Sequence, residues 1–210
     1  MAKKVYNLII LDRSGSMESI REATVAGINQ TLDSIRKAAD TGLTQLVTIM
    51  PFCGCSMDDI CHNAPIGRVT NLTSADFRPC CMTPLYDAIG RACTRLRKEI
   101  DGDHDSAVSV TIITDGYENA SREWDGHSVR SLIESLRAKG WMFAYIGANQ
   151  DTAKVSFELS ITNHMSFKAN PADTKAMFAR ESKARTAWMG RIRNVDTPDG
   201  LAACNDNYFD

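Results

Sequence analysis

Four continuous apolar runs, separated by longer stretches of helical period, constrain the fold of this chain most strongly. The runs are rich in β-branched or aromatic residues and occupy residues 5–11, 46–52, 107–114 and 141–147. Strands that are buried on both faces have this composition, whereas strands with one face in water alternate apolar and polar residues. The four runs therefore predict central strands of a parallel sheet.

The stretches between these runs predict amphipathic helices, because apolar residues recur there at every third or fourth position. The first helix has its apolar stripe over residues 20–35 and is expected to end near Gly42. The other helices are expected over residues 85–100, 128–139 and 171–189. Each is long enough to cross the sheet and return the chain for a parallel strand. The pattern therefore predicts repeated strand–helix–strand units.

The ends of the helices carry recognisable signals. Ser19 and Glu22 have the spacing of a capping box for the first helix. Thr83 is a candidate N-cap for the second helix, with Pro84 in its first turn. Gly140 is expected to end the third helix, because glycine tolerates the left-handed conformation that follows many helices.

These elements predict an α/β fold: a Rossmann-like, doubly wound, mostly parallel central sheet with helices on both faces. Residues 54–66 do not fit this alternation and are predicted to form a hairpin with one antiparallel edge strand. With 210 residues, the chain has the usual size of one domain. We expect that domain over residues 1–190, and a loosely ordered C-terminal tail over 191–210, where periodicity is lacking.

The overall charge excludes two classes of partner. The formal net charge of −2 leaves no basic surface for nucleic acid or for an anionic membrane. No apolar run approaches the roughly 18 residues of a membrane span, and the N-terminal run ends at a charge instead of a cleavage site. A cytoplasmic location is the expectation.

The chain has seven cysteines, an odd number without an export signal, which favours free thiols in a reducing cytoplasm. Thiolates and imidazole suit zinc, so a group of four nearby residues is a candidate zinc site. Their spacing matches no common zinc motif, and the sequence leaves zinc binding there open. The group consists of Cys53, Cys55, Cys61 and His62.

The segment LIILDRSGSM, residues 8–17, delivers three oxygen-bearing side chains directly after the first apolar run. Asp12, Ser14 and Ser16 stand at alternate positions, so in an extended loop they leave the backbone on the same side. Asp115 follows the run at 107–114 in the same way. Oxygen donors without a thiol or an imidazole are the ligands that magnesium prefers.

These residues resemble the metal-ion-dependent adhesion site (MIDAS) of von Willebrand factor type A (VWA) domains, which reads Asp-x-Ser-x-Ser, then a distant Thr, then an Asp commonly followed by Gly. The segments FRPCCMTPLYDAIG and TDGYENAS resemble stand-alone bacterial members, and the resemblance covers roughly residues 5–189. It implies a set of magnesium ligands, with manganese or calcium as alternatives: Asp12, Ser14, Ser16, Thr83 and Asp115.

The resemblance further implies a binding module and not an enzyme, in which a Glu or Asp of a protein partner completes the metal coordination. It also implies that the last helix, 171–189, shifts when the site is occupied. Cys81 departs from the family, since a glycine usually stands two positions before the metal-site Thr. Residues beside the expected ligands are candidates for partner contacts: Arg13, Met17, Tyr86, Tyr117, Glu118 and Asn119.

A metal-dependent phosphoryl or ester hydrolase that uses the same loops is the alternative function. A phosphatase with Asp12 as nucleophile would need a second Asp as general acid two residues later, where this chain has Ser14. A serine hydrolase would need a positioned imidazole. Among the four histidines, His127 alone is expected near the site, while His62, His104 and His164 are expected elsewhere.

Overall fold

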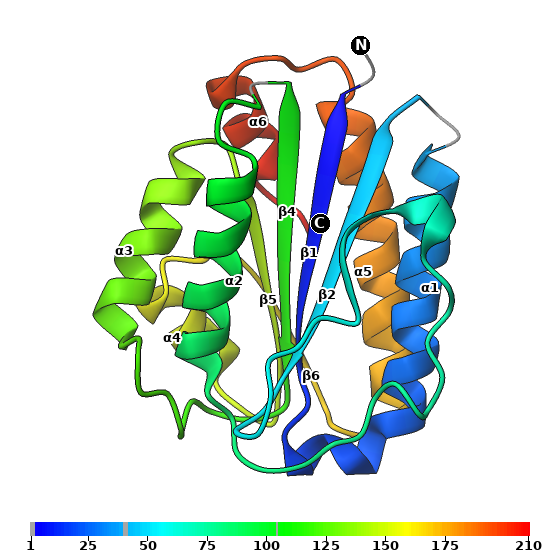
Figure 1. The fold of residues 1–210 in the computed structure, drawn as a ribbon, viewed down its shortest axis with the longest axis vertical. Coiled ribbons are helices and arrows are strands. Elements are labelled where there is room, and N and C mark those ends of the chain that lie inside the picture. Colours follow the sequence, from blue (N-terminus) through cyan, green and yellow to red (C-terminus); the bar gives the residue numbers. More distant parts are fainter. Residues whose placement is uncertain (1–2, 40–41, 104) are drawn as a thin grey trace.

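A computed structural model of the protein, described for residues 3–39, 42–103 and 105–210, has a six-stranded sheet between layers of helices (Figure 1). The elements in chain order are β1 (Lys4–Asp12), η1 (Gly15–Ile20), α1 (Arg21–Ala39), β2 (Thr44–Phe52), β3 (Cys61–Pro65), η2 (Ile66–Arg68), α2 (Leu85–Glu99), β4 (Ser106–Thr114), α3 (Gly126–Arg137), β5 (Met142–Ala148), α4 (Thr152–Glu158), β6 (Asn163–Phe167), α5 (Pro171–Ile192) and α6 (Pro198–Asn205).

The strand order is β3-β2-β1-β4-β5-β6, with β1 at the centre. β1 pairs in parallel with β2 and β4, and β5 and β6 continue the parallel sheet. β3 is antiparallel to β2 and forms one edge. This arrangement confirms the predicted fold class, including its antiparallel edge strand.

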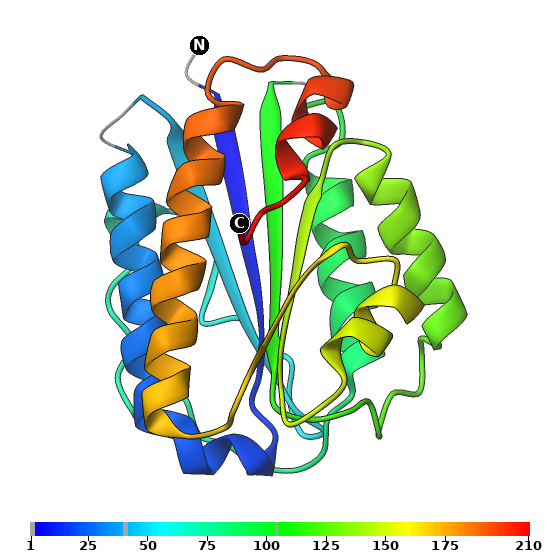
Figure 2. The same ribbon diagram turned by 180° about the vertical axis from the view of Figure 1, so that it is seen from behind.

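Helices cover both faces of the sheet (Figures 1 and 2). α1 and α5 pack on one face, and their apolar residues join one core cluster that includes Ile28 and Trp188. α2 and α3 pack on the other face around a second cluster that includes Ile89 and Ile133. Strand residues alternate between the two clusters: Ile9 belongs to the first and Leu8 to the second. The continuous apolar runs therefore reflect burial on both faces of the sheet.

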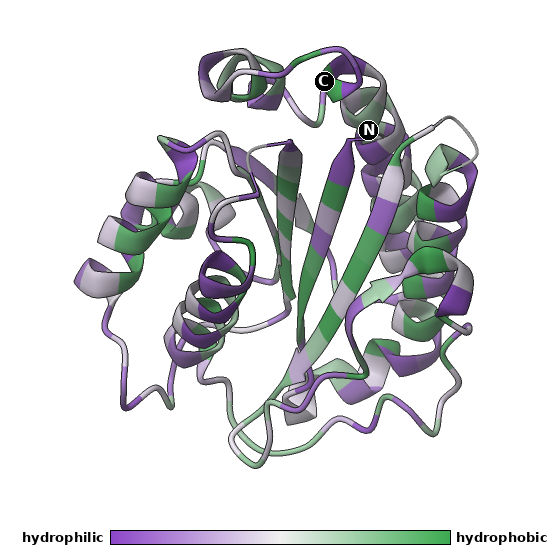
Figure 3. Cartoon of the chain, turned by 45° about the horizontal axis from the view of Figure 1, so that its top comes forward, coloured by the Kyte–Doolittle hydropathy of each residue, from purple (hydrophilic) through white to green (hydrophobic). Residues whose placement is uncertain are grey.

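The apolar residues are concentrated in the sheet and on the inner faces of the helices. Figure 3 shows the central strands mostly in green, while purple residues recur along the helices. From β1 to β5, the central parallel strands are buried along nearly their whole lengths. In the part of the chain that the structure describes, no helix combines the length and the apolar character needed to cross a bilayer.

Two of the predicted helix starts differ from the structure. Ser19 lies inside the 3-10 helix η1, its hydroxyl donates to the backbone oxygen of Ser16, and Glu22 accepts from Ser74 instead. The prediction of a capping box was wrong, because the 3-10 helix η1 leads directly into α1. Thr83 was also wrong as an N-cap: α2 begins after Pro84 and has no side-chain cap.

Other helix ends have side-chain caps or a glycine. Asp125 caps α3 through the backbone N–H of Ser128, and Asn170 caps α5 with Pro171 in its first turn. Gly140 has a φ of 84° and follows α3, as its expected role requires. α4 is an additional short helix that the sequence pattern did not predict.

The last twenty residues are more ordered than the sequence pattern suggests. Thr197 caps α6, and Leu201 of α6 is buried. Tyr208 is 1% exposed and packs with α5 in the first core cluster. Single anchoring residues such as these create no periodic pattern, so the sequence pattern of residues 191–210 gives no sign of them.

A buried polar network holds α5 against the sheet. Arg185 is fully buried and donates to Glu181 of its own helix, with a shortest N–O distance of 2.6 Å. It also donates to Asn7 on β1 (2.9 Å) and to Thr111 on β4 (2.8 Å). Tyr208 donates to Glu181 at 3.2 Å. The guanidinium and carboxylate are thus paired and hydrogen-bonded on several sides.

Candidate metal site at the carboxyl edge of the sheet

Two neighbouring parallel strands end at the same edge of the sheet and bring their terminal carboxylates together. β1 ends at Asp12, and β4, its parallel neighbour, ends at Thr114, directly before Asp115. Ligands of open α/β sheets bind beyond this carboxyl edge. Asp12 is 0% exposed and Asp115 is 7% exposed, so both carboxylates are withdrawn from water.

The DRSGS loop links these two carboxylates through hydroxyl groups. The backbone N–H of Ser14 donates to Asp12 Oδ1 at 2.7 Å, which fixes the turn after β1. The hydroxyl oxygens of Ser14 and Ser16 are 3.1 Å apart, and Ser16 donates to Asp115 Oδ1 at 2.5 Å. Four of the five predicted ligands therefore form one connected cluster of oxygen atoms, which we call the oxygen cluster.

Thr83 reaches the same place from the loop before α2. Its Oγ1 lies 3.6 Å from the position that a side-chain carbon on Gly116 would occupy, so it stands over the residue next to Asp115. Asn119 holds the backbone of Thr83 in place. Asn119 Oδ1 accepts from the Thr83 N–H at 2.8 Å, and the Asn119 N–H donates to the backbone oxygen of Thr83 at 3.1 Å. The structure thus brings all five predicted residues to one edge.

The electrostatics of the oxygen cluster favour a cation. Burial raises the pKa of Asp12 to about 6, although hydrogen bonds from Thr114 and Ser14 oppose the shift. Burial also raises the pKa of Asp115, partly offset by the hydroxyl of Ser16. Among the residues that the structure describes, no Lys, Arg or His forms an ion pair with either carboxylate. Within the described part of the chain, the two carboxylates therefore lack a counter-charge.

The donor set fits a hard divalent ion. It offers two carboxylates and three hydroxyls, all of them oxygen ligands, and magnesium takes such ligands while keeping some of its waters. Ser16 is exposed, so the cluster opens to solvent on one side. An ion and an outside ligand therefore have access to the carboxylates.

Sequence reasoning missed two residues that shape this site. Thr114 donates to Asp12 Oδ2 at 2.6 Å and so orients the carboxylate. Asp87 on α2 accepts from the backbone N–H groups of three successive residues, 122–124, and anchors the loop that follows Asp115. Glu118, expected only beside a ligand, accepts from the N–H of Tyr86 at 2.9 Å. The sequence offered one signal for these residues: the TDG segment at 114–116 follows a predicted strand and so points to Thr114.

The cysteines differ from the expectation of free thiols throughout. Cys55 and Cys81 form a disulfide, and five cysteines are free. Cys81 has a φ of 62°, a left-handed conformation that glycine adopts more readily than cysteine. The departure noted in the sequence therefore falls on a backbone position that disfavours a side chain.

The four residues predicted as a zinc group do not come together. Cys61 on β3 donates to the backbone oxygen of Val47, and His62 pairs with Asp59 and Glu99. His127 is exposed at the start of α3, and among the described residues its ring forms no bond to the oxygen cluster. His164 lies on the edge strand β6, and His104 is outside the described residues.

Comparison with known proteins rests on structure alone, since no family model and no curated protein sequence matches this chain. The pilus adhesin SpaC from Lactobacillus rhamnosus GG superposes with a TM-score of 0.64 at 13% identity, over 88% of this chain and 30% of that one. The PilB minor pilin from Streptococcus sanguinis gives a TM-score of 0.57 at 13% identity, over 89% and 62%. This chain thus spans less than two thirds of the length of these neighbours.

A neighbour of similar size has the same architecture. The vWF domain of the type V pili tip protein Mfa5 from Porphyromonas gingivalis is 10% identical, with a TM-score of 0.54 over 88% of this chain and 96% of that one. Together with the oxygen cluster at the carboxyl edge, this places the protein in a structural class: it has the von Willebrand factor type A fold. At such identities the likeness establishes the fold alone.

Proposed function

We propose that this protein is a divalent-cation-dependent protein-binding module. Asp12, Ser14, Ser16, Thr83 and Asp115 would hold a magnesium ion, and an acidic side chain of a protein partner would complete its coordination. The observation that carries the proposal is the buried pair of carboxylates, joined by hydroxyls and without a counter-charge among the described residues. Unpaired buried charge is costly unless a ligand neutralises it.

The chemistry of the donors explains why the partner would be acidic. Two carboxylates can neutralise a divalent ion, but the three hydroxyls add no formal charge. When bound, the ion supplies a positive centre that keeps electrophilic character towards an incoming carboxylate. The role of this chain is to orient Asp12 through Thr114 and Ser14, and Asp115 through Ser16.

Manganese and calcium stay in the proposal as alternative ions. One structural neighbour is the manganese-loaded TRAP protein of Plasmodium vivax, 12% identical with a TM-score of 0.54 over 84% of this chain and 73% of that one. Manganese accepts the same oxygen ligands as magnesium. This supports testing both ions.

The rim of the site supports a protein as the partner. Met82 is 55% exposed and stands next to Thr83, and Tyr117 is 52% exposed, two residues after Asp115. Large apolar side chains in water beside a polar site are typical of contact surfaces for proteins, where aromatic residues and Met are enriched. A free ion alone would gain nothing from them.

The hydrolase alternative has less support from the geometry. The hydroxyls of Ser14 and Ser16 bond to each other and to Asp115, and neither bonds to an imidazole among the described residues. Activation of a serine requires such a base. The residue two positions after Asp12 carries a hydroxyl and not the carboxylic acid that a phosphatase would use.

We also propose that the protein works in the reducing cytoplasm of a bacterium. The odd number of cysteines, with five free thiols in the structure, supports this location. In that compartment the bond between Cys55 and Cys81 would be open. The resemblance of TDGYENAS to bacterial members supports the source.

Titration calorimetry with magnesium and with manganese tests the metal, and a pull-down from native lysate tests the partner. The wild-type protein is expected to bind either ion and to retain a protein partner that a chelator releases. Asp12→Ala should fold, but lose both ion binding and the partner. Asp33→Ala, which changes an exposed carboxylate on α1, is the matched control and should behave as wild type. Equal heats in wild type and Asp12→Ala would contradict the proposal.

A further inference from the structure

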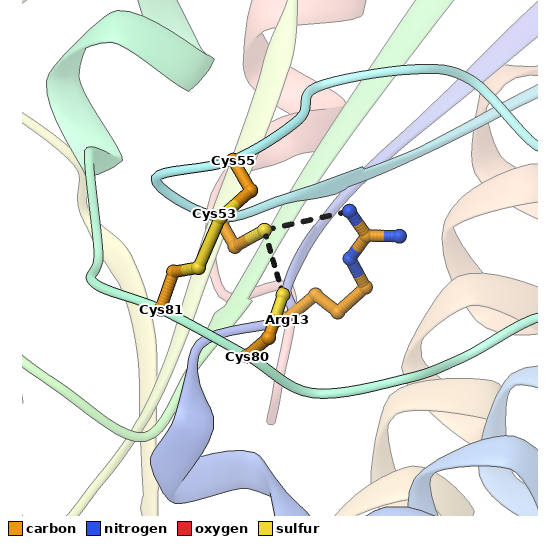
Figure 4. Close-up of a disulfide and its surroundings, with 5 residues drawn as sticks. All are labelled: Arg13, Cys53, Cys55, Cys80 and Cys81. Carbon is orange, nitrogen blue, oxygen red and sulfur yellow. Dashed lines mark hydrogen bonds between the residues drawn. A yellow bond between two sulfur atoms is a disulfide. The ribbon is translucent and has the colours of Figure 1, made fainter.

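Four cysteine sulfurs lie together beside the metal-site loops. Cys53 and Cys55 flank Gly54 in the turn after β2, and Cys80 and Cys81 are adjacent in the loop before α2. The sulfurs of Cys53 and Cys80 are 3.5 Å apart, and Cys55 is joined to Cys81 (Figure 4). We call these four residues the sulfur cluster. Its two halves come from segments 26 residues apart in the sequence.

Donors surround the Cys53 sulfur. Burial alone would raise its pKa, but the Arg13 guanidinium, the backbone N–H groups of Cys55 and Ser56 and the Cys80 thiol outweigh burial and lower it. Arg13 Nη2 lies 3.4 Å from this sulfur, and its buried Nε has no partner among the described residues. Several donors on one sulfur stabilise a thiolate, which is the form that binds metals.

The arrangement has the dimensions of a tetrahedral thiolate site. Zinc–sulfur bonds of about 2.3 Å in a tetrahedron place sulfurs about 3.8 Å apart. Cys53 and Cys80, at 3.5 Å, are already close to that spacing. The sulfurs of Cys53, Cys55 and Cys80 all lie within 4.8 Å of one another. Opening the Cys55–Cys81 bond would supply the fourth ligand at the same place.

We propose that the sulfur cluster, once reduced, binds one zinc ion through Cys53, Cys55, Cys80 and Cys81. A dithiol reductant donates two electrons and two protons to the Cys55–Cys81 disulfide, which gives two thiols while the reductant becomes a disulfide. Zinc then displaces the protons of the four thiols to solvent, without any further electron transfer. This site is separate from the oxygen cluster, because thiolates select zinc and carboxylates with hydroxyls select magnesium.

The zinc would brace the loops that carry the oxygen cluster. The Cys80 N–H donates to the Arg13 oxygen at 2.9 Å, and the Gly15 N–H donates to the Cys81 oxygen at 3.1 Å. The Gly54 N–H donates to the oxygen of Met82, next to Thr83, at 2.9 Å. The sulfur cluster therefore joins the DRSGS loop and the loop of Thr83 through backbone bonds. The proposal does not depend on magnesium binding.

Metal analysis of the reduced full-length chain tests the site. The protein is treated with a dithiol, incubated with zinc in excess magnesium, and desalted without oxygen. One zinc per chain is expected, with loss of zinc in Cys53→Ser and Cys80→Ser. Replacement of zinc by cobalt should give the intense visible absorption of tetrahedral cobalt thiolate. This spectrum identifies the ligands in the wild-type chain, so the test does not depend on whether a variant folds.

Three matched variants distinguish zinc at the sulfur cluster from zinc bound elsewhere on the chain. Cys61→Ser and Cys204→Ser change cysteines outside the sulfur cluster and should keep zinc. Asp12→Ala should keep zinc as well, which distinguishes this site from the oxygen cluster. Any of four results would overturn the proposal: reduced wild-type protein that binds no zinc, zinc retained in Cys53→Ser, iron in place of zinc after purification, or a cobalt spectrum without thiolate bands.

Discussion

Two regions in which the protein buries carboxylates differ in their charge balance: among the described residues, a counter-charge is present in one region and absent from the other. Beneath α5, Glu181 is paired with Arg185, and Thr31 and Tyr208 also donate to its carboxylate. At the carboxyl edge of the sheet, the donors that Asp12 and Asp115 receive from described residues are neutral. The carboxylates are similarly withdrawn from water: Glu181 is 1% exposed and Asp12 is 0% exposed.

This difference separates a structural charge from a binding site. Moving a charge out of water costs several kcal/mol, and an ion pair with further hydrogen bonds offsets that cost. The pair under α5 is complete and needs nothing from outside. The carboxylates of the oxygen cluster keep a raised pKa because burial is not compensated. An uncompensated charge at an edge open to solvent is therefore the better indicator of a ligand.

The same comparison bears on α5, the helix that the resemblance expects to shift when the metal site is occupied. Arg185 ties α5 to β1 through Asn7 and to β4 through Ser109 and Thr111. A shift along the sheet would have to break these bonds together. In this protein, the network opposes the movement of α5.

Removal of one partner from the buried pair is expected to have the largest effect. Arg185→Ala would leave Glu181 charged and unpaired, and should lower the free energy of unfolding by about 3–5 kcal/mol. Denaturant unfolding with a chelator present measures this. The magnesium-dependent rise in melting temperature should persist where the variant folds.

Arg180→Ala is the matched control for this variant. Arg180 lies on the same helix but is exposed, with its guanidinium 5.9 Å from the ring centre of Phe209. Its removal should leave the unfolding curve close to that of wild type. Equal losses in the two variants would mean that the buried pair is not special.

Removal of the charge at Asp12 is expected to act in the opposite direction. Asp12→Asn should stabilise the metal-free protein at pH 7 by up to about 3 kcal/mol, because a pKa raised from 3.8 to about 6 corresponds to ~1.4 kcal/mol per unit. Thr114 can accept from the new amide and turn its own hydroxyl to the Gly116 oxygen, 3.0 Å away. Thermal unfolding should also show no magnesium-dependent shift. A loss as large as that of Arg185→Ala would contradict this view.

The pH dependence of stability should reveal the same carboxylate. Because burial raises the folded-state pKa of Asp12 to about 6, its contribution is fully present below pH 3.8 and is lost as the pH rises through about 6. The metal-free wild type should therefore lose up to ~1.4 kcal/mol of stability per pH unit from this group between these two values. Unfolding at pH 4, 5, 6 and 7 in a chelator measures the slope. A slope equally steep in Asp12→Asn would assign it to other groups.

The smallest effect is expected at Thr83. Thr83→Val keeps the shape of the side chain and removes one oxygen, so magnesium affinity should fall about tenfold, or ~1.4 kcal/mol. The stability of the metal-free protein should hardly change, because Thr83 does not cap α2. Thr94→Val removes a buried hydroxyl of α2 that has no partner among the described residues, and it serves as control. Unchanged affinity in Thr83→Val, measured by calorimetry, would remove Thr83 from the ligand set.

The sequence by itself determined the order of the elements and the edge where the site lies. Continuous apolar runs identify β1, β2, β4 and β5, because strands buried on both faces have no polar alternation. Parallel strands end at one edge, so the carboxylates that follow β1 and β4 had to be neighbours. The DRSGS spacing added two hydroxyls to the same side. These conclusions follow from local patterns, so the spacing of residues along the chain is sufficient to reach them.

Only the tertiary structure decided which side chains satisfy one another across the chain. Thr83 had the sequence of a helix cap, yet it lies over Gly116 because Asn119 holds its backbone. Tyr208 is buried and donates to Glu181, and the sulfur cluster unites residues 26 positions apart. Such contacts depend on how separate elements pack, and the periodicity of the sequence does not show which distant residues meet.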